Sequence, residues 1–158
     1  MTTVVDTSAV LALLYPDDEH NDRAERLLTE AAAENRLVAN PVVYAELAAD
    51  STFTDRDSLD YFLDDTGIET DEIPAETAYR AGEAFETYLS RRGEELECPG
   101  CGRATTFECP DCGRTITARQ HIAADFLIGA HAEREEELIT FDGGFYRDYF
   151  DVSVRTVK

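Results

Sequence analysis

Four acidic residues occupy positions where packing alone would not place a carboxylate. Asp6 and Asp142 each follow a short apolar run that predicts a buried β-strand. Glu46 and Asp125 interrupt apolar stretches that predict helices. Because an unpaired carboxylate costs several kcal/mol to bury, such residues are usually paired or bound to cations. The four acids are therefore the first candidates for chemistry in this sequence.

A parallel sheet would bring these acids together. Asp6 and Asp142 fall just past the carboxyl ends of their strands, where parallel α/β sheets bind ligands. Helices carrying Glu46 and Asp125 could pack against the same edge, and three or four converging carboxylates suit hard divalent cations such as Mg²⁺ or Mn²⁺. Simpler interpretations stay open, with Asp6 as a helix cap and with Glu46 and Asp142 as solvated groups. Asp125 is the hardest to dismiss, because hydrophobic residues flank it on both sides.

All four cysteines lie in one short segment with an internal repeat. The hexapeptide Cys-Pro-x-Cys-Gly-Arg occurs twice, with a period of eleven residues. In a reducing cytoplasm such pairs indicate a metal site rather than disulfides, and four thiolates complete the tetrahedral shell of a structural Zn²⁺. An iron–sulfur centre and a metal-free segment are the alternatives. The expected zinc ligands are Cys98, Cys101, Cys109 and Cys112.

Short strands alternate with helices along the rest of the chain. This order predicts an α/β fold with a central parallel sheet and helices on both faces. Residues 92–117 break the alternation, so we expect a single domain, 1–158, with a small zinc-ribbon insertion at 94–117. The expected strands are 2–5, 37–39, 67–73, 138–140 and 152–157, and the expected helices are 7–14, 17–35, 41–49, 55–64, 74–91, 120–133 and 144–150.

The chain is strongly acidic. It has 34 acidic and 14 basic residues, a formal net charge of −20, and a single lysine, Lys158. Acidity with almost no lysine indicates a halophilic protein from a salt-rich cytoplasm, where a Debye length of about 3 Å at 1 M salt screens the repulsion; an ordinary acidic protein is the alternative. The charge argues against a basic-patch nucleic-acid binder, but not against a nuclease that holds phosphate through metal ions.

The sequence shows no sign of a membrane or secreted protein. No apolar run reaches the ~18 residues of a membrane helix, and the start lacks the basic region of a secretory signal. We therefore expect a cytoplasmic protein without a membrane partner.

Four segments around the acids resemble the motifs of PIN-domain ribonucleases, especially the VapC-type toxins of toxin–antitoxin pairs. They are 4–9, 44–47, 124–132 and 140–146. The resemblance implies a PIN-like three-layer α/β/α fold, hydrolysis of RNA phosphodiester bonds, Mg²⁺ or Mn²⁺ as the cofactor, a homodimer and a small antitoxin partner. The aromatic helix 59–63 offers a surface for such contacts. By the same resemblance, the catalytic residues and Mg²⁺ ligands are Asp6, Glu46, Asp125 and Asp142, with supporting hydroxyls from Ser8 and Thr140.

The cysteine module is the main departure from that family. It is spliced into a loop just ahead of Asp125, whereas a related PIN group, the ribosome-maturation nucleases, carries a zinc ribbon beyond the last acid. Residues 91–119 hold five arginines and five acids, so they are neutral beside a strongly acidic body. Arg103 and Arg114 each follow one Cys pair and are candidate RNA contacts. The alternative is that the zinc only stabilises the loop and that the insertion contacts no ligand.

Two other functions stay open for the whole chain. One is a PIN nuclease of RNA processing that has no antitoxin. The other is a non-catalytic module whose zinc ribbon binds RNA or protein. The intact set of four acids argues against the second, and an antitoxin gene beside this one would separate the toxin from the first.

Overall fold

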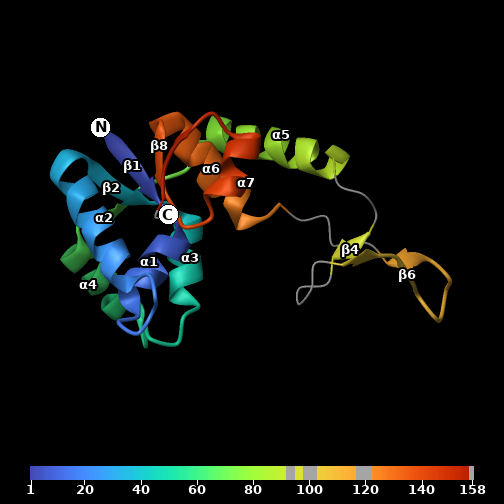
Figure 1. Cartoon of the computed structure of the whole chain (residues 1–158), viewed down its shortest axis with the longest axis horizontal. Helices are drawn as coiled ribbons and strands as arrows, with labels where there is room; N and C mark the ends of the chain where they lie inside the picture. The colour runs from blue at the N-terminus through green and yellow to red at the C-terminus, as the bar shows by residue number, and fades with distance from the viewer. Residues whose placement is uncertain (92–94, 98–102, 117–121, 157–158) are drawn as a thin grey trace.

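Within the described residues, the central sheet has five parallel strands. The computed structural model describes the chain apart from residues 92–94, 98–102, 117–121 and 157–158 (Figure 1). The strands run in the order β3-β2-β1-β8-β9, and every neighbouring pair is parallel. This confirms the predicted α/β fold with a central parallel sheet. The strands are β1 (Thr2–Val5), β2 (Arg36–Ala39), β3 (Ile68–Thr70), β8 (Glu137–Ile139) and β9 (Ser153–Arg155).

The helices lie close to their expected positions, with one clear difference. α2 begins at Asn21 rather than near Asp17, because the preceding residues form turns in which the Asp18 carboxylate accepts the His20 N–H at 2.7 Å. The expected start of the 120–133 helix, at residue 120, lies outside the described residues; the described helix begins at Ala124. The helices are α1 (Thr7–Leu14), α2 (Asn21–Glu34), α3 (Pro41–Ala48), α4 (Arg56–Thr66), α5 (Ala75–Arg91), α6 (Ala124–Glu135) and α7 (Gly143–Tyr149).

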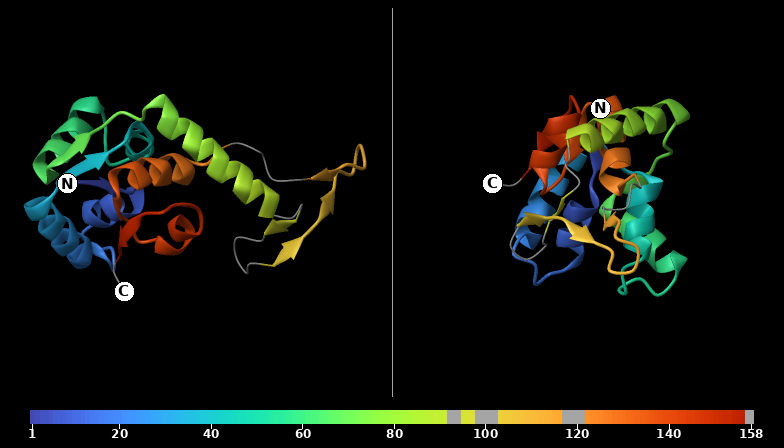
Figure 2. Two further views of the ribbon diagram at one scale, coloured as in Figure 1. Left: turned by 90° about the horizontal axis from the view of Figure 1, so that it is seen from above. Right: turned by 90° about the vertical axis from the view of Figure 1, so that its right-hand side faces the viewer.

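Helices cover both faces of the sheet. α6 packs against β1 and β8, with α5 beside it, and α2 packs against β2 from the other face (Figure 2). Apart from Thr2 and Arg36 at their starts, the central strands β1, β2 and β8 are therefore buried, which explains their nearly continuous apolar sequence. None of the helices in the described ranges has the length and apolarity that a membrane span requires.

The strand order reverses between β1 and β8. From β1 the chain passes through α1 and α2 to β2 on one side, whereas β8 pairs with β1 on the other side. In open α/β sheets, the carboxyl ends of strands at such a reversal border a crevice that binds ligands. Asp6 and Asp142 follow these two strands.

The cysteine module forms short antiparallel ladders beyond the end of α5. Figures 1 and 2 show them projecting away from the sheet. The ladders pair β4 (Leu96–Glu97) with β5 (Ala104–Thr105), and β6 (Phe107–Glu108) with β7 (Thr115–Ile116).

Candidate active site at the carboxyl ends of β1 and β8

Asp6 is held in place by side chains from three elements. Its backbone N–H donates to the carbonyl of Ile139 at 2.9 Å, which continues the pairing of β1 with β8. Its side chain, in a residue that is 6% exposed, caps no backbone N–H of α1. Instead, Asp6 accepts hydrogen bonds from Ser8 at 2.7 Å, Thr140 at 2.7 Å and Tyr146 at 3.2 Å. Asp6 therefore occupies the N-cap position of α1, but its carboxylate is turned toward these hydroxyls instead of the helix backbone.

Ser8 and Thr140 also organise the loop that follows β8. The Thr140 hydroxyl oxygen accepts the backbone N–H of Asp142 at 3.0 Å, and the Ser8 hydroxyl oxygen accepts that of Phe141 at 3.2 Å. Each hydroxyl thus donates to the Asp6 carboxylate while it accepts from the loop that carries Asp142. This geometry couples two of the predicted acids through two of the predicted supporting hydroxyls.

Glu46 and Asp125 reach the same place from α3 and α6. The Thr7 hydroxyl, at the start of α1, donates a hydrogen bond to the Glu46 carboxylate. Asp125 lies in the first turn of α6. Its pKa is raised above the usual value, first by partial desolvation and then by the negative charges of Asp6, Glu46 and Asp142. The charges of Asp6, Glu46 and Asp142 therefore all act on the Asp125 carboxyl.

Tyr146 is a site residue to which the sequence analysis gave no role. It is 1% exposed and donates its hydroxyl hydrogen to Asp6. Its pKa is strongly raised, first by burial and then by the charges of Asp6 and Asp125, so it stays a neutral donor. The available signal was spacing, because Tyr146 lies four residues after Asp142 and so on the same face of a helix. Thr7, which directly follows Asp6 in the sequence, was also given no role in the site.

The charge of this site suits a divalent cation. Within the described ranges, no arginine, lysine or histidine forms an ion pair with any of the four acids. Like charges at close range repel, and a raised pKa is the expected consequence. Converging carboxylate oxygens with uncompensated charge are the donor set that Mg²⁺ and Mn²⁺ bind.

The described half of the cysteine module forms a tight turn at Cys109, where the Gly113 N–H donates to the Cys109 carbonyl at 2.8 Å. The backbone N–H groups of Asp111 and Cys112 point at the Cys109 sulfur and lower the pKa of its thiol. Gly113 follows with φ 70°, a left-handed conformation that favours glycine. Cys98 and Cys101 lie outside the described residues, so the four-cysteine site stays a prediction.

The two arginines predicted to contact RNA are exposed. Arg103 and Arg114 immediately precede β5 and β7, and neither forms an ion pair with any described residue. Their guanidinium groups are therefore available to a ligand, although their role stays a prediction.

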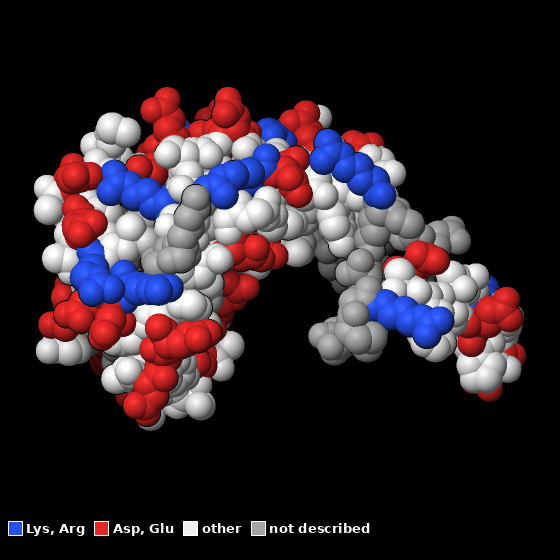
Figure 3. Space-filling view, in the orientation of Figure 1, with Lys and Arg blue, Asp and Glu red and all other residues white. Residues whose placement is uncertain are grey.

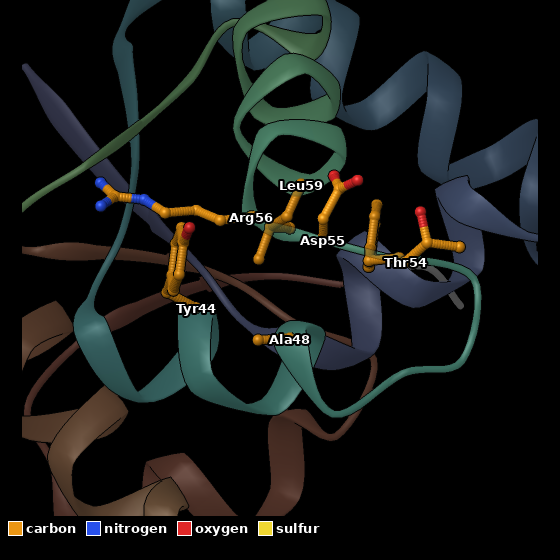
Figure 4. A pocket seen from close by; sticks show the side chains of 7 residues that line it. Tyr44, Ala48, Thr54, Asp55, Arg56 and Leu59 are labelled. Carbon is orange, nitrogen blue, oxygen red and sulfur yellow. The ribbon is translucent and has the colours of Figure 1, made fainter.

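A separate hollow lies between α3 and α4 (Figure 4). Its volume is ≈ 350 Å³, and none of the four acids lines it. On α4, Leu59 and Leu63 belong to the core, and Tyr61 is 72% exposed, so the aromatic surface expected at 59–63 is smaller than the sequence indicated. The lining residues are Tyr44, Ala48, Phe53, Thr54, Asp55, Arg56 and Leu59.

Comparison with known families agrees with this fold. The model of the PIN domain matches residues 3–92, which is more than half of the 158 residues. The chain therefore belongs to the PIN-domain family. The matched range contains Asp6 and Glu46, whereas Asp125 and Asp142 lie beyond it. No protein with curated annotation matches the sequence.

Solved structures share the architecture at low sequence identity. VapBC2 from Rickettsia felis, bound to a DNA fragment from the promoter, gives a TM-score of 0.62 at 18% identity and covers 100% of both chains. FitAcB from Neisseria gonorrhoeae gives a TM-score of 0.57 at 17% sequence identity, and the match covers 98% of this chain and 96% of that chain. VapC20 from Mycobacterium tuberculosis, a sarcin-ricin loop cleaving toxin, gives a TM-score of 0.52 at 17% sequence identity. The match covers 96% of this chain and 98% of that chain. At such identities the likeness establishes the fold alone.

Proposed function

We propose that this chain is a metal-dependent endoribonuclease that uses Asp6, Glu46, Asp125 and Asp142. The observation that carries the proposal is the environment of Asp125, whose pKa is raised first by burial and then by the charges of Asp6, Glu46 and Asp142. Repulsion of this kind has no structural benefit of its own, and a bound cation removes it. The same acids lie at the strand-order reversal where such sheets bind ligands.

The four acids would hold Mg²⁺ or Mn²⁺. When bound, such an ion polarises a phosphoryl oxygen, lowers the pKa of water and offsets the charge that develops on the phosphate. The protein's own contribution is positional. Ser8 and Thr140 fix one oxygen of Asp6, and the neutral Tyr146 hydroxyl fixes the other, so the carboxylate cannot rotate away. Among described residues, no arginine, lysine or histidine forms an ion pair with these acids.

The biological role that we propose is that of a toxin. The support is the likeness in fold to VapBC2, FitAcB and VapC20, the last of which is described as cleaving the sarcin-ricin loop. A homodimer and a small antitoxin belong to this proposal, and the hollow between α3 and α4 offers apolar surface to such a partner. A small gene beside this one, whose product co-purifies with the chain and inhibits it, would support the role.

We also propose that the insertion at 94–117 holds one structural Zn²⁺ through its four cysteines. The support is the turn at Cys109 and the exposure of the ladder around it, where the cross-strand pair Phe107 and Ile116 is 54% and 43% exposed. A segment with no core of its own needs a metal or another staple. Cys109→Ser should lose the zinc by elemental analysis while the α/β body keeps its far-UV circular dichroism.

We further propose that the insertion contacts the RNA substrate beside the active site. In the sequence, only six residues separate the end of the insertion from α6, whose first turn carries Asp125. Figure 3 shows acidic side chains over much of the body, with a recess between the body and the ladders. At molar salt counterion release contributes little to RNA affinity, so directed contacts from Arg103 and Arg114 would matter more. Replacing both with alanine should keep zinc and fold but weaken RNA binding.

The test of the nuclease proposal is cleavage of labelled RNA at molar KCl with Mg²⁺. We expect the parent to cleave, EDTA to stop cleavage, and Asp6→Asn and Asp125→Asn each to lower the rate by at least about 100-fold, because each loses an ion ligand. Asp22→Asn, at an exposed acid in the first turn of α2, is the matched control and should keep the parent rate. Parent-like cleavage by either site variant would refute the assignment.

A further inference from the structure

His131 on α6 is a fully buried side chain without a hydrogen-bond partner. It is 0% exposed, and within the described part of the chain neither ring nitrogen has a partner. A buried polar group without a partner costs about 1–3 kcal/mol, so the position calls for a ligand or another explanation. The active-site proposal makes no use of this residue.

Two carboxylates face this imidazole. Asp71 directly follows β3, and its backbone N–H donates to the carbonyl of Ala39 at 2.9 Å, which fixes its place at the sheet edge. Glu135 lies one turn after His131 on α6, so the two side chains share a face. The distance from His131 Nε2 to Asp71 Oδ2 is 3.8 Å, and one donor atom from each of the three residues lies within 4.8 Å of the others.

Arginines border the cluster without satisfying the imidazole. Arg36 approaches the Asp71 carboxylate at 3.7 Å, and Arg134 approaches Glu135 at 3.8 Å. Both guanidinium groups are hydrogen-bond donors only, so neither can accept from a ring N–H. Burial lowers the pKa of His131, while Asp71 and Glu135 oppose the shift. At neutral pH the ring is therefore uncharged, and a nitrogen lone pair is free to bind a cation.

We propose that Asp71, His131 and Glu135 form a second metal site, separate from the four acids, that takes a transition-metal ion such as Zn²⁺. One imidazole nitrogen and two carboxylates are a donor set for Zn²⁺ rather than for Mg²⁺, which prefers oxygen. Ligand atoms around tetrahedral zinc stand about 3.3 Å apart for bonds of about 2.0–2.1 Å. Closing the cluster to that size needs only side-chain rotation of the partly exposed Asp71 and Glu135.

The site would fasten α6 to the edge of the sheet. Asp71 belongs to the segment after β3, and α6 carries both other ligands as well as Asp125 at its opposite end. An ion held by the three residues would therefore resist movement of the helix that positions an active-site acid. Its expected effect is on stability and on the placement of α6, not on the chemistry of the reaction.

The test follows the imidazole nitrogens by NMR of ¹⁵N-histidine-labelled protein. The chain has three histidines, so His131 is assigned once the His20→Gln and His121→Gln spectra are compared with the parent. The full-length Cys109→Ser variant, which removes the proposed competing zinc site, is titrated with Zn²⁺ and, separately, with Mg²⁺ at molar KCl. We expect one His131 ring nitrogen to shift with Zn²⁺ and not with Mg²⁺, and the unfolding temperature to rise with Zn²⁺.

Variants of the two carboxylates separate binding at this site from binding elsewhere. Asp71→Asn and Glu135→Gln should each raise the Zn²⁺ concentration at half-saturation by at least about 10-fold. Glu72→Gln, at the exposed neighbour of Asp71, is the control and should titrate like the parent. A His131 ring unaffected by millimolar Zn²⁺ in folded protein would overturn the proposal. So would a ring found protonated at neutral pH, since the three residues would then be an ion triad.

Discussion

The hydroxyl of Thr140 is the most informative single group to remove. Thr140 is 0% exposed, donates to Asp6 at 2.7 Å and accepts from the backbone N–H of Asp142 at 3.0 Å. Valine has the same shape, so Thr140→Val deletes both hydrogen bonds without opening a cavity. The perturbation tests whether this hydroxyl orients the site, as the structure indicates.

The expected cost follows from the two bonds. A hydrogen bond to an ionised carboxylate contributes about 1.5–3 kcal/mol, and one between neutral groups about 0.5–1.5 kcal/mol. The added methyl group offsets part of the loss, since it is buried. We therefore expect the free energy of unfolding to fall by about 2–3 kcal/mol. RNA cleavage should fall by about 10–100-fold, which is typical of residues that orient metal ligands.

The assay is urea denaturation at molar KCl, with RNA cleavage measured on the same preparations. Thr77→Val is the matched control. Thr77 is also buried, on α5, and its side chain makes no hydrogen bond to another described residue, so this variant should keep the parent's stability and activity. Equal unfolding free energies for Thr140→Val and Thr77→Val would refute the reasoning about the Asp6 network.

Three further perturbations have definite expected outcomes. Gly129→Ala places a Cβ 2.3 Å from the Phe150 ring and should lower the free energy of unfolding in urea by about 1–3 kcal/mol. At Gly82, an added Cβ has no neighbouring atom within 4 Å, so Gly82→Ala should raise the free energy of unfolding by about 0.5–1 kcal/mol. Without divalent ions, Asp125→Asn should stabilise the protein at neutral pH. This gain in stability should vanish as the pH falls through the raised pKa of Asp125, because the parent carboxyl is then also neutral. A gain that persists in acid would contradict the repulsion. The unfolding temperature should rise from dilute to molar KCl, because salt screens a net charge of −20; an unchanged temperature by calorimetry would count against a protein adapted to salt.

The fold could be predicted from the sequence because its signals are local. The apolar runs of β1 and β8 and the long amphipathic α5 are recognisable without tertiary information. The start of α2 was misplaced because a side-chain hydrogen bond of Asp18 competes with the helix, and propensity does not report such competition. The placement of β3 at the sheet edge likewise depends on pairing that only the folded chain defines.

The candidate site likewise contains residues that could be proposed from the sequence and residues that could not. The four acids could be proposed from the sequence because each is an unexpected carboxylate in an apolar or strand-end context. Tyr146 was not assigned a role, because a buried aromatic residue on a helix is ordinary until its hydroxyl is seen to meet Asp6. The approach of His131 to Asp71 was not predicted, because it joins residues sixty positions apart and has no sequence signature.

The central claim is that the four carboxylates act by binding a metal ion. Its most direct test is RNA cleavage by Asp125→Cys in Mg²⁺ and in a softer ion such as Cd²⁺. Thiolate binds soft ions better than hard ones. The variant should therefore be inactive with Mg²⁺ and recover part of the parent's rate with the softer ion. Cleavage at the parent's rate in Mg²⁺ would contradict the claim, because the Asp125 carboxylate would then not be needed.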